Sequence, residues 1–245
     1  MVKAYFISDL HIGAEDNEKE LVRQKHILKF LHKISKDATR IYIVGDLFDF
    51  WFEYKTVIPK KYFAFLNTFK NMTDKGIEIH YLAGNHDFAL GNFFDKFLGI
   101  KTWENEYTFE LAGSKFFIWH GDGLAKEDTG YRILKRILRN KFNQRIFRWI
   151  HPDLGFKLAR FTSSSSRKYT NQLNYQRDEK DYIEFAEQKF SEGFNYVMMG
   201  HRHRPLVHEE NSNKYINLGE WIDRCSYAVF DGKDLELSYF PSTDV

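Results

Sequence analysis

Aspartate, asparagine and histidine gather at five places in this sequence, each directly after a short apolar run. The clearest is Gly84-Asn85-His86-Asp87, which follows the mostly apolar run 77–83. The other four follow residues 4–8, 41–44, 116–119 and 196–199, and they read Asp9-Leu10-His11, Gly45-Asp46-Leu47-Phe48-Asp49, His120-Gly121-Asp122 and Gly200-His201-Arg202-His203. Because open α/β sheets place their chemistry at the carboxyl ends of strands, the five blocks are predicted to converge on one site.

The donor types in these blocks suit a pair of hard divalent metal ions. Oxygen and imidazole ligands without a nearby thiolate are typical of ions such as Mn²⁺. The candidate ligands are Asp9, His11, Asp46, Asn85, His120, His201 and His203. Two ions about 3.5–4 Å apart can share a carboxylate, lower the pKa of a water molecule and clamp the attacking and leaving oxygens at phosphorus. The residue set therefore predicts phosphoester hydrolysis. Glycines beside the ligands are expected to let the backbone approach closely.

The segments between the blocks alternate between strand and helix patterns. Strands are predicted at residues 2–8, 40–44 and 77–83, with amphipathic helices at 17–36 and 59–75 between them. A short helix near 92–97 precedes a predicted hairpin of 106–111 and 115–119. A helix at 178–191, a strand at 196–199 and four short strands near Leu206, Tyr215, Tyr227 and Leu237 complete the pattern. Repeated βα units predict an α/β fold with helices flanking a sheet.

Residues 123–177 have a different character, because they are helix-forming and basic. Between residues 132 and 168 there are eleven Lys or Arg and one acidic residue, Asp153. Ile133, Leu134, Ile137 and Leu138 alternate with basic residues at helical spacing. We therefore predict a core made of residues 1–122 and 178–245, interrupted by a helical cap at 123–177.

Composition excludes several classes of protein. The 245 residues carry a formal charge of +2 and one cysteine, so an intrachain disulfide is excluded. The first residues lack the basic and long apolar regions of a secretory signal, and we expect a cytoplasmic protein. No run of about 18 apolar residues is present, so contact with a membrane is expected to be peripheral.

In their order and spacing, the five blocks resemble those of the calcineurin-like metallophosphoesterases. The resemblance implies a four-layer αββα sandwich of two mixed sheets, and two metal ions that share Asp46. It assigns Asp9, His11, Asp46 and His203 to one ion, and Asp46, Asn85, His120 and His201 to the other. It also implies that His86 is a catalytic acid that faces the substrate, and that Asp87 orients His86.

A narrower resemblance, to the UDP-2,3-diacylglucosamine diphosphatases of lipid A biosynthesis, extends over nearly the whole chain. It rests on Gly45-Asp-Leu-Phe-Asp-Phe-Trp51, Gly84-Asn-His-Asp-Phe88, His120-Gly-Asp-Gly-Leu124, Gly200-His-Arg-His-Arg-Pro205 and Asn217-Leu-Gly-Glu-Trp221. It implies hydrolysis of a lipid-linked UDP-sugar to UMP and 2,3-diacylglucosamine 1-phosphate, with acyl chains in the cap and its basic face on the inner membrane. Substrate contacts in the cap are implied for Asp128, Tyr131, Arg160 and Ser163.

The sequence departs from that narrower family at a few positions. Many members have arginine where this chain has His86, which follows the pattern of the wider superfamily. Arg167 and Thr170 stand where asparagine and lysine are expected.

Alternative interpretations follow from the same residues. The lipid hypothesis expects no nucleic-acid partner, whereas the alternative is a soluble phosphodiesterase or phosphatase acting on nucleotides, nucleic acid or another phosphoester, with the basic cap as an anion platform. A non-enzymatic scaffold is a third class, but no ligand position is missing. The basic residues can also form an ordinary solvated helix face, and the cap aromatics an ordinary local core.

Overall fold

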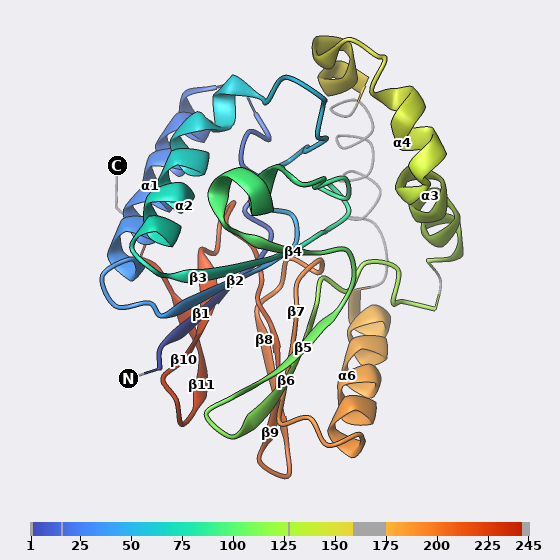
Figure 1. Cartoon of the computed structure of the whole chain (residues 1–245). Helices are drawn as coiled ribbons and strands as arrows, with labels where there is room; N and C mark the ends of the chain where they lie inside the picture. The colour runs from blue at the N-terminus through green and yellow to red at the C-terminus, as the bar shows by residue number, and fades with distance from the viewer. Residues whose placement is uncertain (1, 16, 127, 159–174, 242–245) are drawn as a thin grey trace.

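Two mixed β-sheets lie face to face at the centre of the molecule (Figure 1). The structure is a computed structural model, and it describes residues 2–15, 17–126, 128–158 and 175–241. The first sheet has the strand order β11 (Leu235–Tyr239), β10 (Ser226–Phe230), β1 (Ala4–Ile7), β2 (Arg40–Val44), β3 (Glu78–Leu82) and β4 (Lys101–Trp103). The second has the order β5 (Tyr107–Leu111), β6 (Ser114–Trp119), β7 (Tyr196–Met199), β9 (Asn213–Asn217) and β8 (Leu206–Glu210).

Each sheet contains a parallel centre. Strands β1 to β4 pair in parallel, and so do β6, β7 and β9, while the remaining pairs are antiparallel. The strands β1, β2, β3 and β7 are buried along almost their whole length. Strands buried over this much of their length are expected where both faces of a parallel sheet are covered.

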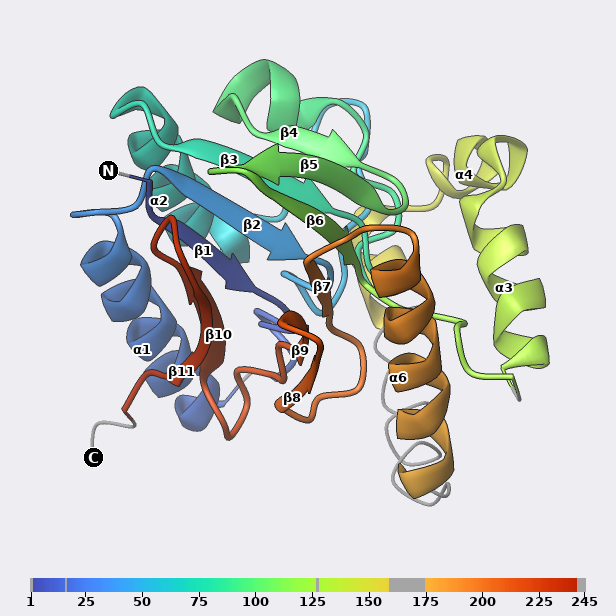
Figure 2. The ribbon, with the colours of Figure 1, turned by 90° about the horizontal axis from the view of Figure 1, so that it is seen from below.

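Helices cover the outer faces of both sheets (Figure 2). Helices α1 (Glu18–Ile34) and α2 (Phe63–Asp74), with the short turn η1 (Lys60–Tyr62), pack on the first sheet, and α6 (Tyr175–Ser191) packs on the second. An apolar cluster also fills the space between the two sheets, where Phe6 of β1 stacks on Phe116 of β6. The prediction of a four-layer αββα sandwich is therefore confirmed.

The sequence itself accounts for the start of α1. The side chain of Asn17 accepts a hydrogen bond of 2.9 Å from the backbone N–H of Glu20, which caps the helix. Glu18 and Glu20 lie in the first turn and His32 and Lys33 in the last, as the helix dipole favours.

The inserted segment lies to one side of the sandwich as two helices, α3 (Thr129–Arg139) and α4 (Lys141–Phe147), and residues 152–158 are also helical (Figures 1 and 2). No residue of α3 or α4 is buried. Large apolar side chains are exposed here, including Trp149 at 89% and Phe142 at 67%. The cap therefore has little apolar core of its own within the described residues.

The predicted strands, hairpin and helices are found close to their expected positions, with small differences. The short helix predicted near residues 92–97 is a single π turn, η2 (Phe94–Leu98), and strand β4 was not predicted. Helix α6 begins at Tyr175, inside the segment predicted to be cap. The substrate residues predicted at Arg160 and Ser163 lie outside the described residues, as do Arg167 and Thr170. No helix in the described ranges is long and apolar enough to cross a bilayer.

Candidate metal centre

The five sequence blocks meet where the two sheets end. Strands β1, β2 and β3 carry the first three blocks at their carboxyl ends, and β6 and β7 of the other sheet carry the last two. Because each set of strands is parallel, its loops leave at the same edge. All seven predicted ligands are brought together there.

The backbone at this edge is held in an unusual conformation. Five predicted ligands have a positive φ, between 43° and 67°, and they are Asp9, His11, Asp46, His201 and His203. Residues other than glycine adopt this left-handed region only when the surrounding structure imposes it, and such residues cluster at functional sites.

One group of ligands is formed by Asp9, His11 and His203, whose donor atoms lie close together. The distance from Asp9 Oδ1 to His203 Nε2 is 3.1 Å, and that from Asp9 Oδ1 to His11 Nε2 is 3.6 Å. The Nε2 atoms of His11 and His203 are 3.1 Å apart. Two imidazole nitrogens at this distance cannot both present a lone pair to each other. Either one of them carries a proton, or both face a cation that lies between them.

The second group adjoins the first through Asp46. The distance from Asp46 Oδ2 to His120 Nε2 is 3.4 Å, and that to His11 Nε2 is 3.7 Å. Asn85 Oδ1 lies 3.0 Å from His120 Nε2 and 2.9 Å from His201 Nδ1. Asp46 therefore faces both groups, which is the position of a bridging carboxylate.

Two observations test whether these residues fit metal ions. Asp9 Oδ1 is buried and accepts no hydrogen bond from the described residues, although its other oxygen accepts from Ser8 Oγ at 2.6 Å and from His201 N at 2.9 Å. His120 Nδ1 lies 2.9 Å from the carbonyl oxygen of Val44. A carbonyl only accepts, so the proton is on Nδ1 and the lone pair of Nε2 points into the site, as in histidines that bind metals.

The electrostatics of the site also favour cations. Burial opposes a charge on His120, yet Asp46 and then Asp9 raise the pKa of His120 to about 10. Burial likewise opposes ionisation of Asp46, but His120 and His86 hold the pKa of this carboxyl far below its usual range. The buried carboxylates thus create a field that a divalent ion can neutralise. The donor set fits two such ions.

Two of the motif glycines are required by close approach between loops. A Cβ on Gly84 would lie 2.1 Å from Asp46 Oδ1 and 2.6 Å from Asp46 N. A Cβ on Gly200 would lie 1.9 Å from Ser8 Oγ and 2.5 Å from Asp9 Oδ2. The sequence predicted close approach of backbone to ions and phosphate, and the structure shows that these glycines first make room for the neighbouring carboxylates.

His86 stands at the edge of the ligand groups, and its position differs from the prediction in one respect. Its Nδ1 donates to the carbonyl oxygen of Asp49 at 2.8 Å and lies 3.8 Å from Asp49 Oδ1. This bond leaves Nε2 for the neighbouring groove, which His86 lines. Asp49, and not Asp87, therefore orients the imidazole.

Asp87 has a different place, which corrects its predicted role beside His86. Its carboxylate is fully buried and accepts hydrogen bonds from the backbone N–H groups of Asp46, Leu47 and Gly84, and from the hydroxyl of Tyr81. Burial, and then Asp46, raise the pKa of Asp87 to about 6. Through these backbone contacts the carboxyl joins the loops after β2 and β3, and so positions the ligands Asp46 and Asn85.

Asp122 connects the metal loops to the cap. Its Oδ2 accepts from the hydroxyl of Tyr131 at 2.7 Å and lies 2.7 Å from Lys135 Nζ and 3.8 Å from Arg139 Nη2. These three residues are spaced by four along α3, so they form one face of the helix. The basic residues of α3 were expected to face outward, but Lys135 and Arg139 face the core.

An apolar groove of about 300 Å³ lies between the cap and the candidate metal centre. Its polar end is formed by Asn85, His86 and Asp49. Its apolar walls come from the core and the cap, and they are Phe50, Phe52, Phe88, Tyr131, Leu134, Ile137, Leu138, Phe147 and Leu158. Tyr131 thus lies where a substrate contact was predicted, whereas Asp128 at the start of α3 does not line the groove.

Sequence reasoning missed a pair of residues on α1 that supports the first ligand loop. Arg23 donates to the carbonyl oxygens of Leu10 and His11, the latter at 2.8 Å, and pairs with Glu20 at 2.7 Å. Glu20 also accepts from the N–H of Gly13 at 2.7 Å. The spacing of Glu20 and Arg23 on a helix was visible in the sequence, but such pairs are common on helix surfaces and carry no sign of a partner.

Comparison with known proteins gives consistent matches. Residues 2–205 match the family model described as calcineurin-like phosphoesterase. A UDP-2,3-diacylglucosamine hydrolase of Porphyromonas gingivalis is 31% identical over 253 residues, covering 96% of each chain. The protein of the same name from Haemophilus ducreyi is 31% identical over 243 residues, covering 97% of this chain and 100% of the relative. A solved structure titled as a novel archaeal phosphodiesterase has a TM-score of 0.49 at 15% identity, covering 98% and 100%.

Proposed function

The chain belongs to the calcineurin-like phosphoesterase family, and from this premise we propose that it hydrolyses the pyrophosphate bond of UDP-2,3-diacylglucosamine to UMP and 2,3-diacylglucosamine 1-phosphate. The relatives named for hydrolysis of this compound match nearly the full length of the chain, cap included. The structural observation that carries the proposal is the apolar groove that ends at His86 and Asn85. A phosphoester held at the metal centre would place an attached acyl chain in that groove.

The exposed apolar residues of the cap support a lipid substrate. Ile137 is 51% exposed and Leu134 is 49% exposed, and both line the groove. Isolated exposed apolar residues need no explanation, but a row of them along one cavity is typical of a binding surface. Burying each methylene of an acyl chain there contributes about 0.8 kcal/mol.

We assign the metal-ligand role to the seven residues named from the sequence, with Asp46 shared. Two divalent ions, for which Mn²⁺ fits the mixed oxygen and imidazole donors, would supply the lowered pKa of water and the charge that polarises the phosphate. His86 lines the groove, and because Nδ1 is bonded to the Asp49 carbonyl, Nε2 carries a proton only in the imidazolium form. The imidazolium can donate that proton to the leaving oxygen or stabilise negative charge. Asp49 keeps the imidazole in that orientation.

We further propose that the cap rests on the cytoplasmic surface of the inner membrane. Exposed apolar side chains at Trp149 and Phe142 lie on the same insertion as exposed cations such as Arg136. This combination is typical of segments that lie on anionic lipid rather than cross it. Arg160 and Ser163 stay predictions for substrate contact.

The test is turnover of UDP-2,3-diacylglucosamine by the purified protein with Mn²⁺ and detergent in ¹⁸O-labelled water, followed by phosphorus NMR. We expect UMP that carries the label and unlabelled lipid monophosphate, because water attacks the α-phosphorus. Analogues with shorter acyl chains should turn over more slowly.

Bis-p-nitrophenyl phosphate, run in parallel, separates this proposal from the alternative. Rapid cleavage of the diester with no attack on the lipid nucleotide would refute the lipid substrate and favour a soluble phosphodiesterase. No turnover of either compound by metal-loaded protein would refute the enzymatic role.

A further inference from the structure

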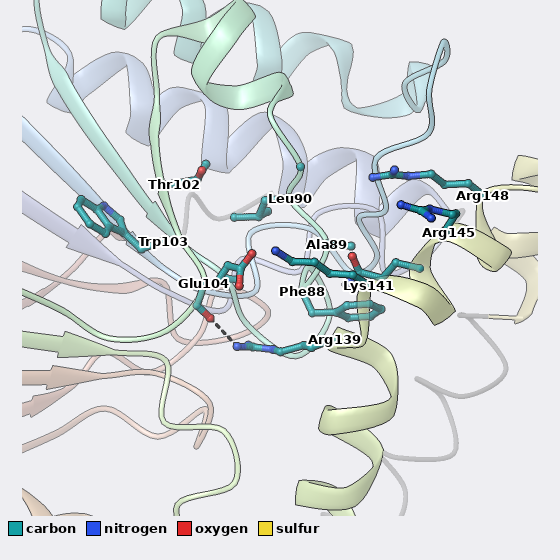
Figure 3. A pocket seen from close by; sticks show the side chains of 13 residues that line it. Phe88, Ala89, Leu90, Thr102, Trp103, Glu104, Arg139, Lys141, Arg145 and Arg148 are labelled. Atoms are coloured by element: carbon teal, nitrogen blue, oxygen red, sulfur yellow. Dashed lines mark hydrogen bonds between the residues drawn. The ribbon is translucent and has the colours of Figure 1, made fainter.

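A second cavity, of about 410 Å³, lies on the other side of the cap, between α4 and the loops beside β4 (Figure 3). Its core side is formed by residues such as Leu90, Thr102 and Trp103, and its cap side by basic residues. Its volume is in the range of sites for small molecules, about 300–1,000 Å³. It contains none of the predicted metal ligands.

Positive charge dominates this cavity. Arg139, Lys141, Arg145 and Arg148 line it, opposed by the single carboxylate of Glu104. Figure 3 shows the side chains of Lys141, Arg145 and Arg148 extending from the cap toward the core, and Lys141 reaches toward Leu90 and Glu104. Cations at this spacing on a short helix repel one another.

The described structure does not neutralise these charges. Within the described ranges, the side chains of Lys141 and Arg145 make no hydrogen bond or ion pair. To the part of the chain that the structure describes, the Arg148 side chain donates only through Nε, to the carbonyl oxygen of Glu53 at 3.3 Å. Arg139 donates to Asn105 Oδ1 at 3.0 Å and to Gly84 O at 3.4 Å. The side chains of Lys141, Arg145 and Arg148 are exposed to solvent, yet all three line the same concave space, so one anion could meet them together.

The cavity is linked to the candidate metal centre by shared residues. Phe88 and Gln144 line both the cavity and the apolar groove, so they form the wall between them. Arg139 also reaches Asp122 and the carbonyl of Gly84, next to the ligand Asn85. A group that binds Arg139 in the cavity therefore acts on residues that hold the cap to the metal loops.

We propose that this cavity is a second anion site, separate from the metal centre, that binds a phosphate group through Lys141, Arg145 and Arg148. Guanidinium groups match the geometry of phosphate oxygens. Three cations that line one cavity should bind a phosphate dianion more tightly than a carboxylate, which carries a single charge. The phosphate can belong to a small soluble compound or to a lipid headgroup, since both present the same group. Binding there would hold α4 against the loop that follows β3.

The proposal can be tested by labelling with pyridoxal 5′-phosphate, whose aldehyde condenses with a lysine amine and is then fixed by borohydride. Labelled sites in the metal-loaded protein are mapped by mass spectrometry. We expect Lys141 to be labelled about tenfold faster than the exposed cap residue Lys157, because a bound phosphate raises the local concentration of the aldehyde. Pyridoxal without phosphate should show no such preference.

Matched variants make the test specific. Arg145→Gln should slow the labelling of Lys141, whereas Arg136→Gln, which removes an exposed cation of α3 outside the cavity, should not. Inorganic phosphate should protect Lys141 at constant ionic strength, and acetate should not. Equal labelling of Lys141 and Lys157, or equal effects of the two variants, would overturn the proposal.

Two protection experiments distinguish the sources of the phosphate. If the natural ligand is a headgroup, phosphatidylglycerol vesicles protect Lys141 at phosphate concentrations where UMP does not, and phosphatidylcholine vesicles protect less. If it is a soluble phosphate compound, UMP or inorganic phosphate protects and vesicles add nothing. Either pattern of protection supports the anion site and identifies its ligand class. If none of these compounds protects Lys141, the anion site is refuted, and the proposed metal-dependent reaction is unaffected.

Discussion

The Asp122 carboxylate lies 2.7 Å from Lys135 Nζ, which joins the block that contains the candidate ligand His120 to the cap helix α3. Asp122 is almost fully buried, and Lys135 also lies over the ring of Trp119 at 5.7 Å. The contact connects two segments of very different character, one forming the site and one forming the groove. It suggests that the cap is positioned by charge as well as by apolar packing.

Replacing Lys135 with methionine should therefore affect the lipid substrate selectively. Without the ammonium group the cap helix loses the shorter of its two cationic contacts with Asp122, and we expect kcat/KM for UDP-2,3-diacylglucosamine to fall about tenfold, equivalent to about 1.4 kcal/mol. Turnover of bis-p-nitrophenyl phosphate, which needs no acyl groove, should change by less than about twofold. Arg136→Met, at an exposed neighbouring position, is the control, and equal losses in both variants would contradict the positioning role.

Replacing Asp46 with asparagine should remove metal-dependent turnover. The carboxylate faces both ligand groups, so its loss weakens both ion sites, and we expect activity to fall by at least about 100-fold. Metal content measured by plasma mass spectrometry should fall together with activity. An Asp46→Asn protein that retains activity would refute the shared-carboxylate arrangement.

His86→Ala should separate catalysis from metal binding. Because Nδ1 of His86 is held by the Asp49 carbonyl and Nε2 faces the groove, the variant should keep its metal content and lose about 10²–10³ in kcat. His86→Arg should restore a large part of the rate on the lipid substrate if a positive charge is what the position supplies. Loss of metal from His86→Ala would mean that His86 is itself a ligand.

Gly84→Ala should damage the site through a single methyl group. The added Cβ would meet Asp46 at 2.1 Å, so the loop must shift, and we expect weaker metal binding and a free energy of unfolding lower by about 1–3 kcal/mol. Gly130→Ala is the matched control, since nothing lies within 4 Å of its Cβ and it lies in helix α3. That change should leave metal binding unchanged and stabilise the helix slightly. Chemical denaturation and metal titration of both variants check the prediction.

The stability of the first sheet should depend on pH through Glu78. The hydrogen bond from Lys101 lowers the pKa of Glu78 to about 2, against the opposing effect of burial, and His80 adds to the lowering. A carboxyl with a depressed pKa in the folded state stabilises the protein above its usual pKa of about 4.5, and this contribution is lost as pH falls toward about 2. Glu78→Gln should therefore flatten the fall in stability between about pH 5 and pH 2.

Acid denaturation followed by circular dichroism measures this effect. Glu236→Gln, on the exposed side of β11, is the control and should leave the pH dependence as it is. A Glu78→Gln protein with the pH profile of the unsubstituted chain would contradict the role of the Lys101 contact.

Much of the fold was predictable because the local signals agreed. Residues 196–199 form a continuously apolar, buried strand, and Gly76 ends the helix before residues 77–83, so apolar runs and turn chemistry gave the same boundaries. The π turn at Phe94–Leu98 and the short strand β4 were less predictable, because a turn or a strand of three residues carries too little pattern. Their form depends on packing against neighbouring elements.

The sequence by itself determined the metal-ligand candidates and their convergence, since donors at the ends of parallel strands can only meet at one edge of the sheets. Only the tertiary structure decided which residues hold the ligands and the cap in place without being ligands themselves. It placed Asp87 on the backbone of the ligand loops, put Asp49 beside His86, turned Lys135 toward Asp122 and left Lys141 and Arg145 facing a cavity. These contacts join segments far apart in the chain, and their geometry depends on how the cap packs against the core, which helical periodicity cannot specify.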